Sequence, residues 1–406
     1  MSPLLLTAIA LLHAAPPQAL TLDQLLAEVS RSAPAVAVQR GSVSVAEAGV
    51  GLAGAWDEPT ITVMGEGLPL GGGPFDETMV TYRVGQPLNL FGRRGAARRA
   101  ARAQVAAESQ NLRRVTSDAR AQAVRLFWEL WMNQQMTGVI ERQLATLGEM
   151  REAGLARVRA GMMMGHHDVL RAQAEIAAME AERAALADER AAMAAMLNAL
   201  RGHPLEEAVP EPAAPERQPL PALARLLPLA PGSPEVAAMR AMRDEMAARV
   251  DLARREAWPM VMVEAEYEQR IGMPDGYGVA LVLTIPLWRE RARGEVTMAR
   301  AMERRAERAV TAMSVMASTE LRMAWSRARA AERKLDALEH SALPSMQETV
   351  ASIETGYRTG ASDGFLALLE AVMALRQLEA QALSARLDLE WGRAELARIA
   401  GREEQR

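Results

Sequence analysis

The sequence repeats itself once, and this internal repeat limits the folds that the chain can adopt. Its period is about 199 residues, the separation of Pro87 from Pro286 and of Gly202 from Gly401. Further matches pair Pro59 with Pro259, Gly95 with Gly294, Gly161 with Gly360, and Gly165 with Gly364. Because proline and glycine mark turns and helix ends, we infer two tandem copies of one structural unit, at 20–202 and 234–401.

Each copy contains two segments in which apolar and polar side chains alternate, the pattern of a strand with one apolar face. In the first copy, for example, Tyr82 and Val84 alternate with Arg83 and Gly85. The connections between these segments are rich in Gly, Pro and Asp, which is typical of turns. The predicted strands are at about 59–67, 78–88, 259–270 and 277–287.

Long helices are predicted after each pair of strands. No proline occurs from Gly92 to Arg159, which allows a helix of about 100 Å at 1.5 Å per residue. After a break, apolar residues recur at every seventh position, as in a coiled coil. They are Ala172, Met179, Leu186, Met193 and Leu200. The predicted hairpin helices are 92–159 with 166–201, and 289–355 with 365–400.

Three segments lie outside the two repeats. Residues 203–233 are rich in proline and are predicted to form an extended linker. Residues 1–19 contain a short apolar run that we interpret as a secretory signal, cleaved between 15 and 19; a buried first helix is the alternative. Residues 402–406 form a C-terminal tail. The chain has no cysteine, so we expect neither a disulfide nor a lipid anchor on cysteine.

The predicted strands have the length of membrane-crossing strands, about 9–11 residues. Four strands cannot close on themselves, and an open sheet in lipid would leave unpaired backbone groups. Three copies of the chain would supply twelve strands, which suits a closed β-barrel. With the apolar face toward lipid, a polar lumen would be lined by Arg83, Glu264, Glu266 and Glu268. The alternation alone fits equally well a soluble four-stranded sheet with one solvated face.

The passage from strand to helix carries the motif of a known family. Gln86-Pro87-Leu88-Asn89-Leu90-Phe91-Gly92, with its counterpart Thr284-Ile285-Pro286-Leu287-Trp288, resembles TolC-type outer-membrane efflux proteins and among them the heavy-metal (CzcC/CusC-like) branch. The hairpin ends add a second likeness, at Arg159-Ala160-Gly161 with His167-Asp168-Val169-Leu170 and at Tyr357-Arg358-Thr359-Gly360 with Gly364-Phe365. The resemblance covers essentially the whole chain after the signal segment.

This resemblance implies a mainly α-helical fold with a small β part, assembled as a homotrimer. The twelve strands of the trimer would form a β-barrel in the outer membrane, and its twelve hairpin helices would form a tunnel across the periplasm. The implied partners are a periplasmic adaptor protein and an inner-membrane pump. The implied role is that of a passive conduit for metal ions, drugs or other small molecules, without a cofactor.

By their position in the motifs, the hairpin ends are expected to contact the adaptor. The contact candidates are Gly161, Asp168, Leu170, Ala172, Gly360, Phe365 and Leu369. Asp168 and Tyr357 are also the candidates for the aperture that the hairpin ends close. Both ends carry one residue more than the family pattern, and an apolar residue, Leu366 or Ala367, stands where relatives have a second acid.

The first hairpin end carries thioether and imidazole side chains, which suit a monovalent copper or silver ion in transit. These residues are Met162, Met163, Met164, His166 and His167. Methionine is abundant throughout the chain, with 25 residues, and the same loop would suit packing on an adaptor. No resident metal is predicted.

Five arginines cluster at the start of the first long helix. They are Arg93, Arg94, Arg98, Arg99 and Arg102. Such a cluster could bind phosphate, but its helical spacing favours a solvated face near the membrane.

Enzyme chemistry has little support in the sequence. There is no cysteine, there are five histidines, and no glycine-rich phosphate loop follows a strand. The net charge of −4 gives no reason to expect a nucleic-acid partner. The alternative to a channel is a periplasmic coiled-coil adaptor or structural protein, which would also be exported and contain long hairpins but would not need two strand pairs in tandem.

Overall fold

The computed structural model describes residues 19–67, 78–160, 164–358 and 364–401 of the chain. The chain forms two compact units. Unit 1 comprises 1–37, 116–230 and 318–406, and unit 2 comprises 38–115 and 231–317. Each unit therefore combines segments of both sequence repeats. Within the described ranges, none of the helices combines the length and the apolar character needed to cross a membrane.

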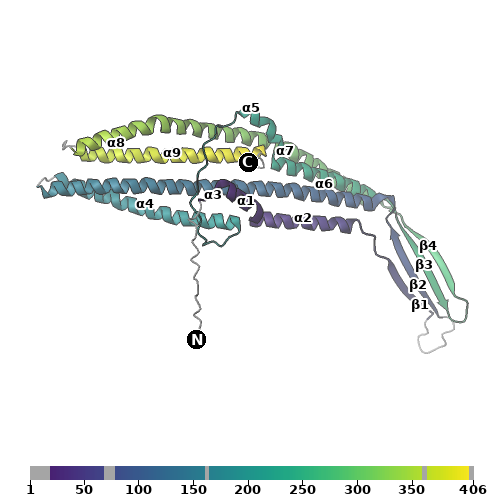
Figure 1. Cartoon of the computed structure of the whole chain (residues 1–406). Helices are drawn as coiled ribbons and strands as arrows, with labels where there is room; N and C mark the ends of the chain where they lie inside the picture. Colours follow the sequence, from purple (N-terminus) through teal and green to yellow (C-terminus); the bar gives the residue numbers. More distant parts are fainter. Residues whose placement is uncertain (1–18, 68–77, 161–163, 359–363, 402–406) are drawn as a thin grey trace, which may run out of the picture. The chain divides into compact units, whose positions relative to one another are not determined.

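The elements follow a similar order in the two repeats (Figure 1). The first repeat contains α1 (Leu22–Ser32), α2 (Pro34–Ala53), β1 (Thr60–Glu66), β2 (Met79–Leu88), α3 (Arg93–Arg159) and α4 (Met164–Arg201). The linker contains the short helix α5 (Leu223–Leu226). The second repeat contains α6 (Pro234–Glu256), β3 (Met260–Arg270), β4 (Gly276–Thr284), α7 (Arg289–Ala337), α8 (Leu343–Arg358) and α9 (Gly364–Ala400). The predicted mainly helical, duplicated fold is confirmed.

The helix predicted at 289–355 is interrupted in the structure. A π-helical turn at Leu338–Ala342 separates α7 from α8. Pro344 explains the interruption, because proline has no backbone N–H and its ring clashes with the carbonyl four residues earlier, that of His340. The wider π-helical turn relieves this clash and lets the helix continue.

The core of unit 1 lies between the helical hairpins. Side chains of α3, α4, α8 and α9 form one apolar cluster, which includes Ile140, Leu147, Ala172, Met179, Leu368 and Leu369. The predicted seven-residue spacing holds near the hairpin end, where Ala172 and Met179 are buried. Farther along α4, Leu197 is buried and Leu200 is only half-buried. A straight helix drifts relative to a seven-residue repeat, which explains this shift.

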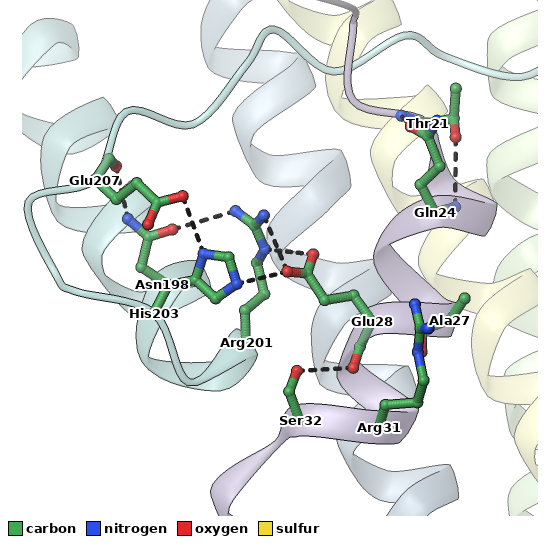
Figure 2. Close-up of polar contacts among 10 residues, drawn as sticks. All are labelled: Thr21, Gln24, Ala27, Glu28, Arg31, Ser32, Asn198, Arg201, His203 and Glu207. Carbon is green, nitrogen blue, oxygen red and sulfur yellow. Dashed lines mark hydrogen bonds and ion pairs between the residues drawn. The ribbon is translucent and has the colours of Figure 1, made fainter.

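A polar cluster in unit 1 fastens the end of α4 to α1 (Figure 2). Glu28 of α1 accepts hydrogen bonds of 2.7 and 3.2 Å from Arg201, and its carboxylate lies 2.6 Å from Nε2 of His203. Asn198 is fully buried, and its Nδ2 donates to two backbone carbonyls of the linker at 3.3 and 2.7 Å. The beginning of the linker is thereby held against the first helix of the repeat.

The last hairpin helix of each repeat ends at a glycine with a positive φ. The angle is +75° at Gly202 and +63° at Gly401. Glycine adopts this left-handed conformation without the steric cost that other residues meet, and it commonly ends helices in this way. These two glycines are also matched by the sequence repeat, so the same physical requirement recurs in both copies.

Gly392 lies at a close contact between α9 and α7. A Cβ atom added there would stand 2.6 Å from Cβ and 3.1 Å from Cα of Ala328. Because neither atom moves without the backbone, we expect Gly392→Ala to destabilise unit 1 by about 1–3 kcal/mol. Gly148→Ala is the matched control: its Cβ would meet nothing within 4 Å, and alanine favours a helix over glycine by roughly 0.5–1 kcal/mol. Thermal unfolding should shift down in the first variant and up in the second; shifts of the same sign would contradict the close contact.

Candidate functional site

Unit 2 contains an antiparallel sheet in the order β1-β2-β3-β4 (Figure 1). Its register places Arg83 of β2 opposite Glu266 of β3. The neighbouring row across the sheet consists of Ile61, Val84, Ala265 and Val279. Because successive residues of a strand point to opposite sides, the sheet has one polar and one apolar face.

The polar face gathers the four residues predicted to line a lumen. Arg83 donates hydrogen bonds to Glu266 from Nε and Nη2, at 3.1 and 2.9 Å, and its Nε lies 3.6 Å from Glu264. Glu268 follows on the same face of β3. The glycine opposite Glu266 on β4, Gly278, leaves room for these long side chains, since a Cβ atom there would lie 2.5 Å from Oε1 of Glu266. The face therefore carries a compact, largely acidic ion-pair cluster.

Aromatic side chains mark both ends of the sheet, a feature that the sequence analysis missed. Near one end, Tyr82, Tyr267 and Tyr277 form one row, with successive ring centroids 6.1 and 5.2 Å apart. At the other end, every strand has an exposed aromatic residue within four positions of its terminus. These residues are Trp56, Phe91, Trp258 and Trp288. Their recurrence beside each predicted strand was a signal available in the sequence.

A tight turn joins β2 to α3. Phe91 has φ +62° and Gly92 has φ +76°, and a left-handed conformation costs a residue such as phenylalanine roughly 1–2 kcal/mol. The ring of Phe91 stacks on Trp258 with centroids 5.2 Å apart, and its carbonyl accepts a hydrogen bond of 3.2 Å from Arg255 of α6. These contacts offset the strain and fix the direction in which the helix leaves the sheet.

Two of the five clustered arginines are paired with acids. Arg93 lies 3.8 Å from Glu256, and Arg99 lies 2.5 Å from Asp251, both acids of α6. The hydrogen bond from Arg99, together with the charges of nearby arginines, holds the pKa of Asp251 below its usual value. The cluster is thus not one uniform solvated face.

The two hairpin ends meet in unit 1 around Arg157. Its Nη2 donates a hydrogen bond of 3.1 Å to the carbonyl of Tyr357, and its guanidinium carbon lies 4.1 Å from the centre of the Tyr357 ring. Its Nη1 lies 4.0 Å from Asp168. The structure thus brings both aperture candidates to one arginine that the sequence analysis missed. Arg157 has no counterpart in the second repeat, where Gly356 occupies the matching position.

Tyr357 is buried and Asp168 is half-buried. The Tyr357 hydroxyl has no hydrogen-bond partner among the described residues, and burial raises the pKa of its phenol. Burial also raises the pKa of the Asp168 carboxyl, while the charges of Arg157 and His167 oppose that shift. Arg157 therefore offsets part of the cost of keeping a carboxylate at this position.

The other contact candidates differ in exposure. Leu170 is exposed, as are His166 and His167. Ala172, Phe365 and Leu369 are buried in the cluster between the hairpins. These three residues therefore shape the hairpin end from within, and their contact with an adaptor stays a prediction. Residues outside the described ranges are Gly161, Met162, Met163 and Gly360, and of Met164 only the backbone is described.

One group of described residues offers three metal-ligating side chains. It consists of Asp336, Glu339 and His340, all exposed. Arg217 already pairs with both carboxylates, at 2.6 and 3.2 Å. These carboxylates therefore belong to an ion-pair network at the surface.

Residues 25–203 match the family of outer membrane efflux proteins. A sequence search among curated proteins finds no match. Among solved structures, the chain is similar to the outer-membrane channel OprN (20% identity, TM-score 0.76, covering 94% of this chain and 89% of that one). It is also similar to the channel protein CusC (15%, 0.78, 93% and 91%) and to the outer membrane protein VceC from Vibrio cholerae (17%, 0.76, 94% and 96%). The family resemblance seen in the sequence motifs is confirmed for residues 25–203. The fold shared with the solved structures extends over both repeats.

We expect Arg157→Ala to weaken the contact between the hairpin ends by ~2 kcal/mol, because it removes a charged hydrogen bond and a cation–π contact. Hydrogen exchange of the backbone at the end of α8 and the start of α4 measures this change. Tyr357→Phe should leave exchange unchanged or slower, since the lost hydroxyl has no partner among the described residues. Arg151→Ala is the control, because Arg151 pairs with the adjacent Glu152 at the surface. Equal exchange in the Arg157 and Arg151 variants would show that Arg157 does not hold the ends together.

Proposed function

Because residues 25–203 match the outer membrane efflux protein family and the whole chain has the fold of solved outer-membrane channels, we propose that the chain is one protomer of a trimeric efflux channel. It acts as a passive conduit and makes or breaks no bond. The observation that carries the proposal is the two-faced sheet of unit 2. Three such sheets supply twelve strands, which close a barrel with the apolar faces toward lipid and with Arg83 and its glutamate partners in the lumen.

The aromatic rows support a membrane position of the sheet. Outer-membrane barrels have an apolar band about 25 Å tall between two aromatic girdles, with strands tilted by about 35–45°. Between Trp258 and Tyr267 the chain advances nine residues. At about 3.3 Å per residue this is roughly 30 Å along the strand, or roughly 23 Å across a membrane after the tilt. The two rows are therefore spaced as the two girdles of such a barrel.

The hairpins of unit 1 form the periplasmic tunnel of the proposed channel, and their ends form its entrance. The exposed surface there, which includes Leu170, His166 and His167, contacts a periplasmic adaptor that joins the channel to an inner-membrane pump. Asp168 and Tyr357 lie at the aperture, held by Arg157. The cargo is a metal ion, a drug or another small molecule. Contact of a monovalent metal with the methionines and histidines of the first hairpin end stays a prediction.

Fractionation of cells that express the full chain tests the proposal. We expect the protein in the outer membrane, as a trimer that survives SDS without heating and dissociates when boiled, because each sheet needs its neighbours to satisfy its edges. A monomer in the soluble periplasmic fraction would exclude the channel and would favour the adaptor or structural alternative.

Adjacent substitutions on β4 test which face meets lipid. Val279 lies on the apolar face, and Ala280 lies on the polar face opposite Glu264. An arginine on the lipid face costs about 2–4 kcal/mol at the membrane midplane, so Val279→Arg should reduce the amount of assembled trimer in the membrane. Ala280→Arg is the matched control and should assemble normally, since its charge is solvated and lies near a carboxylate. Equal assembly of both variants would contradict the proposed orientation.

A further inference from the structure

A set of arginines lies just beyond the strand ends that carry Phe91 and Trp288. We call them the collar arginines: Arg94, Arg98 and Arg102 in the first turns of α3, and Arg289 and Arg293 in the first turns of α7. Among the described residues, no carboxylate forms an ion pair with any of them, whereas the nearby Arg291 pairs with Glu295. They differ in this from Arg93 and Arg99, which face the acids of α6.

The sheet places all the collar arginines at one end of the strands. The last residue of β2, Leu88, pairs with Val261 near the start of β3, and Met260 pairs with Thr284 at the end of β4. The helices α3 and α7 therefore both leave the sheet at this end, where Figure 1 shows them beginning. The collar arginines thus follow directly after the aromatic residues of this end.

Electrostatics disfavours the three arginines at the start of α3 unless an anion is present. A helix N-terminus carries a partial positive charge, which favours acidic residues there, yet the first turn of α3 contains none. Arg94, Arg98 and Arg102 are also spaced by four, which places like charges side by side along the helix. An external anion would relieve both unfavourable interactions.

The segment that follows α2 holds two of these side chains in place. The Arg94 guanidinium carbon lies 4.5 Å from the centre of the Trp56 ring. The Arg98 side chain packs against Gly54, where an added Cβ atom would lie 2.9 Å from the Arg98 Cδ. The Arg94 guanidinium group is therefore positioned beside an aromatic residue, and the Arg98 side chain lies against the same segment. A guanidinium group offers a fork of donors that matches phosphate oxygens.

We propose that the collar arginines bind the phosphate groups of anionic phospholipids in the membrane leaflet that faces the periplasm. This inference rests on the proposed function, because it requires the sheet to lie in the membrane. A lipid fits better than free phosphate, since the neighbouring Trp258, Leu287 and Trp288 are exposed and offer an apolar surface to acyl chains. The collar is then a binding surface for a specific lipid class at the base of the barrel.

Native mass spectrometry of the trimer, purified in neutral detergent, tests this assignment. With added phosphatidylglycerol or phosphatidylcholine, the wild type should retain the anionic lipid preferentially. The triple variant Arg94→Gln/Arg98→Gln/Arg102→Gln should lower retention of phosphatidylglycerol on the order of a hundredfold, because three cationic groups near the lipid surface are lost. Retention of phosphatidylcholine should not change.

The matched control carries the same loss of charge farther along α7. It is Arg322→Gln/Arg327→Gln/Arg333→Gln, and all three side chains are exposed. This control should retain phosphatidylglycerol as the wild type does. Equal losses in both triple variants, or no loss in the collar variant, would overturn the assignment. Displacement of the lipid by millimolar inorganic phosphate would show a site for free phosphate and would also overturn it.

A second collar variant keeps the test valid if the triple variant fails to fold. Arg289→Gln/Arg293→Gln lies on the other helix, where both side chains are exposed, and it should also reduce retention of phosphatidylglycerol. If this double variant forms trimers and retains the lipid fully, the collar does not bind it. Failure of the wild type to form a membrane trimer would instead contradict the proposed function, so the two failures are distinguishable.

Discussion

The need to pair strand edges is the constraint on which the rest of this molecule depends. The sheet of one chain ends at β1 and β4, and each unpaired backbone group exposed to hydrocarbon would cost several kcal/mol. Duplication pairs the inner edges, because β2 of the first repeat pairs along its whole length with β3 of the second. In the proposed trimer, the neighbouring chains pair with the outer edges at β1 and β4. Oligomerisation is then a condition of folding in lipid and not a later addition.

Close packing of small residues is the second recurring device. The core between the hairpins is aliphatic, and at Gly392 and Ala328 the helices approach so closely that a single methyl group does not fit. Polar contacts are used where an element must be fixed at a chosen place, as Glu28 does for the end of α4 and Arg157 for the hairpin ends. Apolar packing therefore determines the distance between the helices, and polar and charged contacts fix the positions of the helix ends.

Much of the fold could be predicted because its signals are local. Alternation marked the strands, the absence of proline marked α3, and glycine marked the ends of α4 and α9. The site was predicted less well, because its properties depend on contacts distant in sequence. Ala172, Phe365 and Leu369 lie in the motifs at the hairpin ends, yet packing of one hairpin on the other buries them. Arg157 lacks a repeat counterpart, and nothing in its neighbourhood showed that it reaches Tyr357, 200 positions away.

The π-helical turn before Pro344 has a consequence for how such a chain can change over time. In an ordinary helix, one inserted residue rotates every later side chain by about 100° and would ruin a packed face. A π-helical turn holds one residue more than an α-helical turn and confines that misfit to a few positions. The helix formed by α7 and α8 can thus gain or lose a single residue at this turn. The side chains beyond the turn would keep their packing partners, because the change in helical phase is absorbed within the turn.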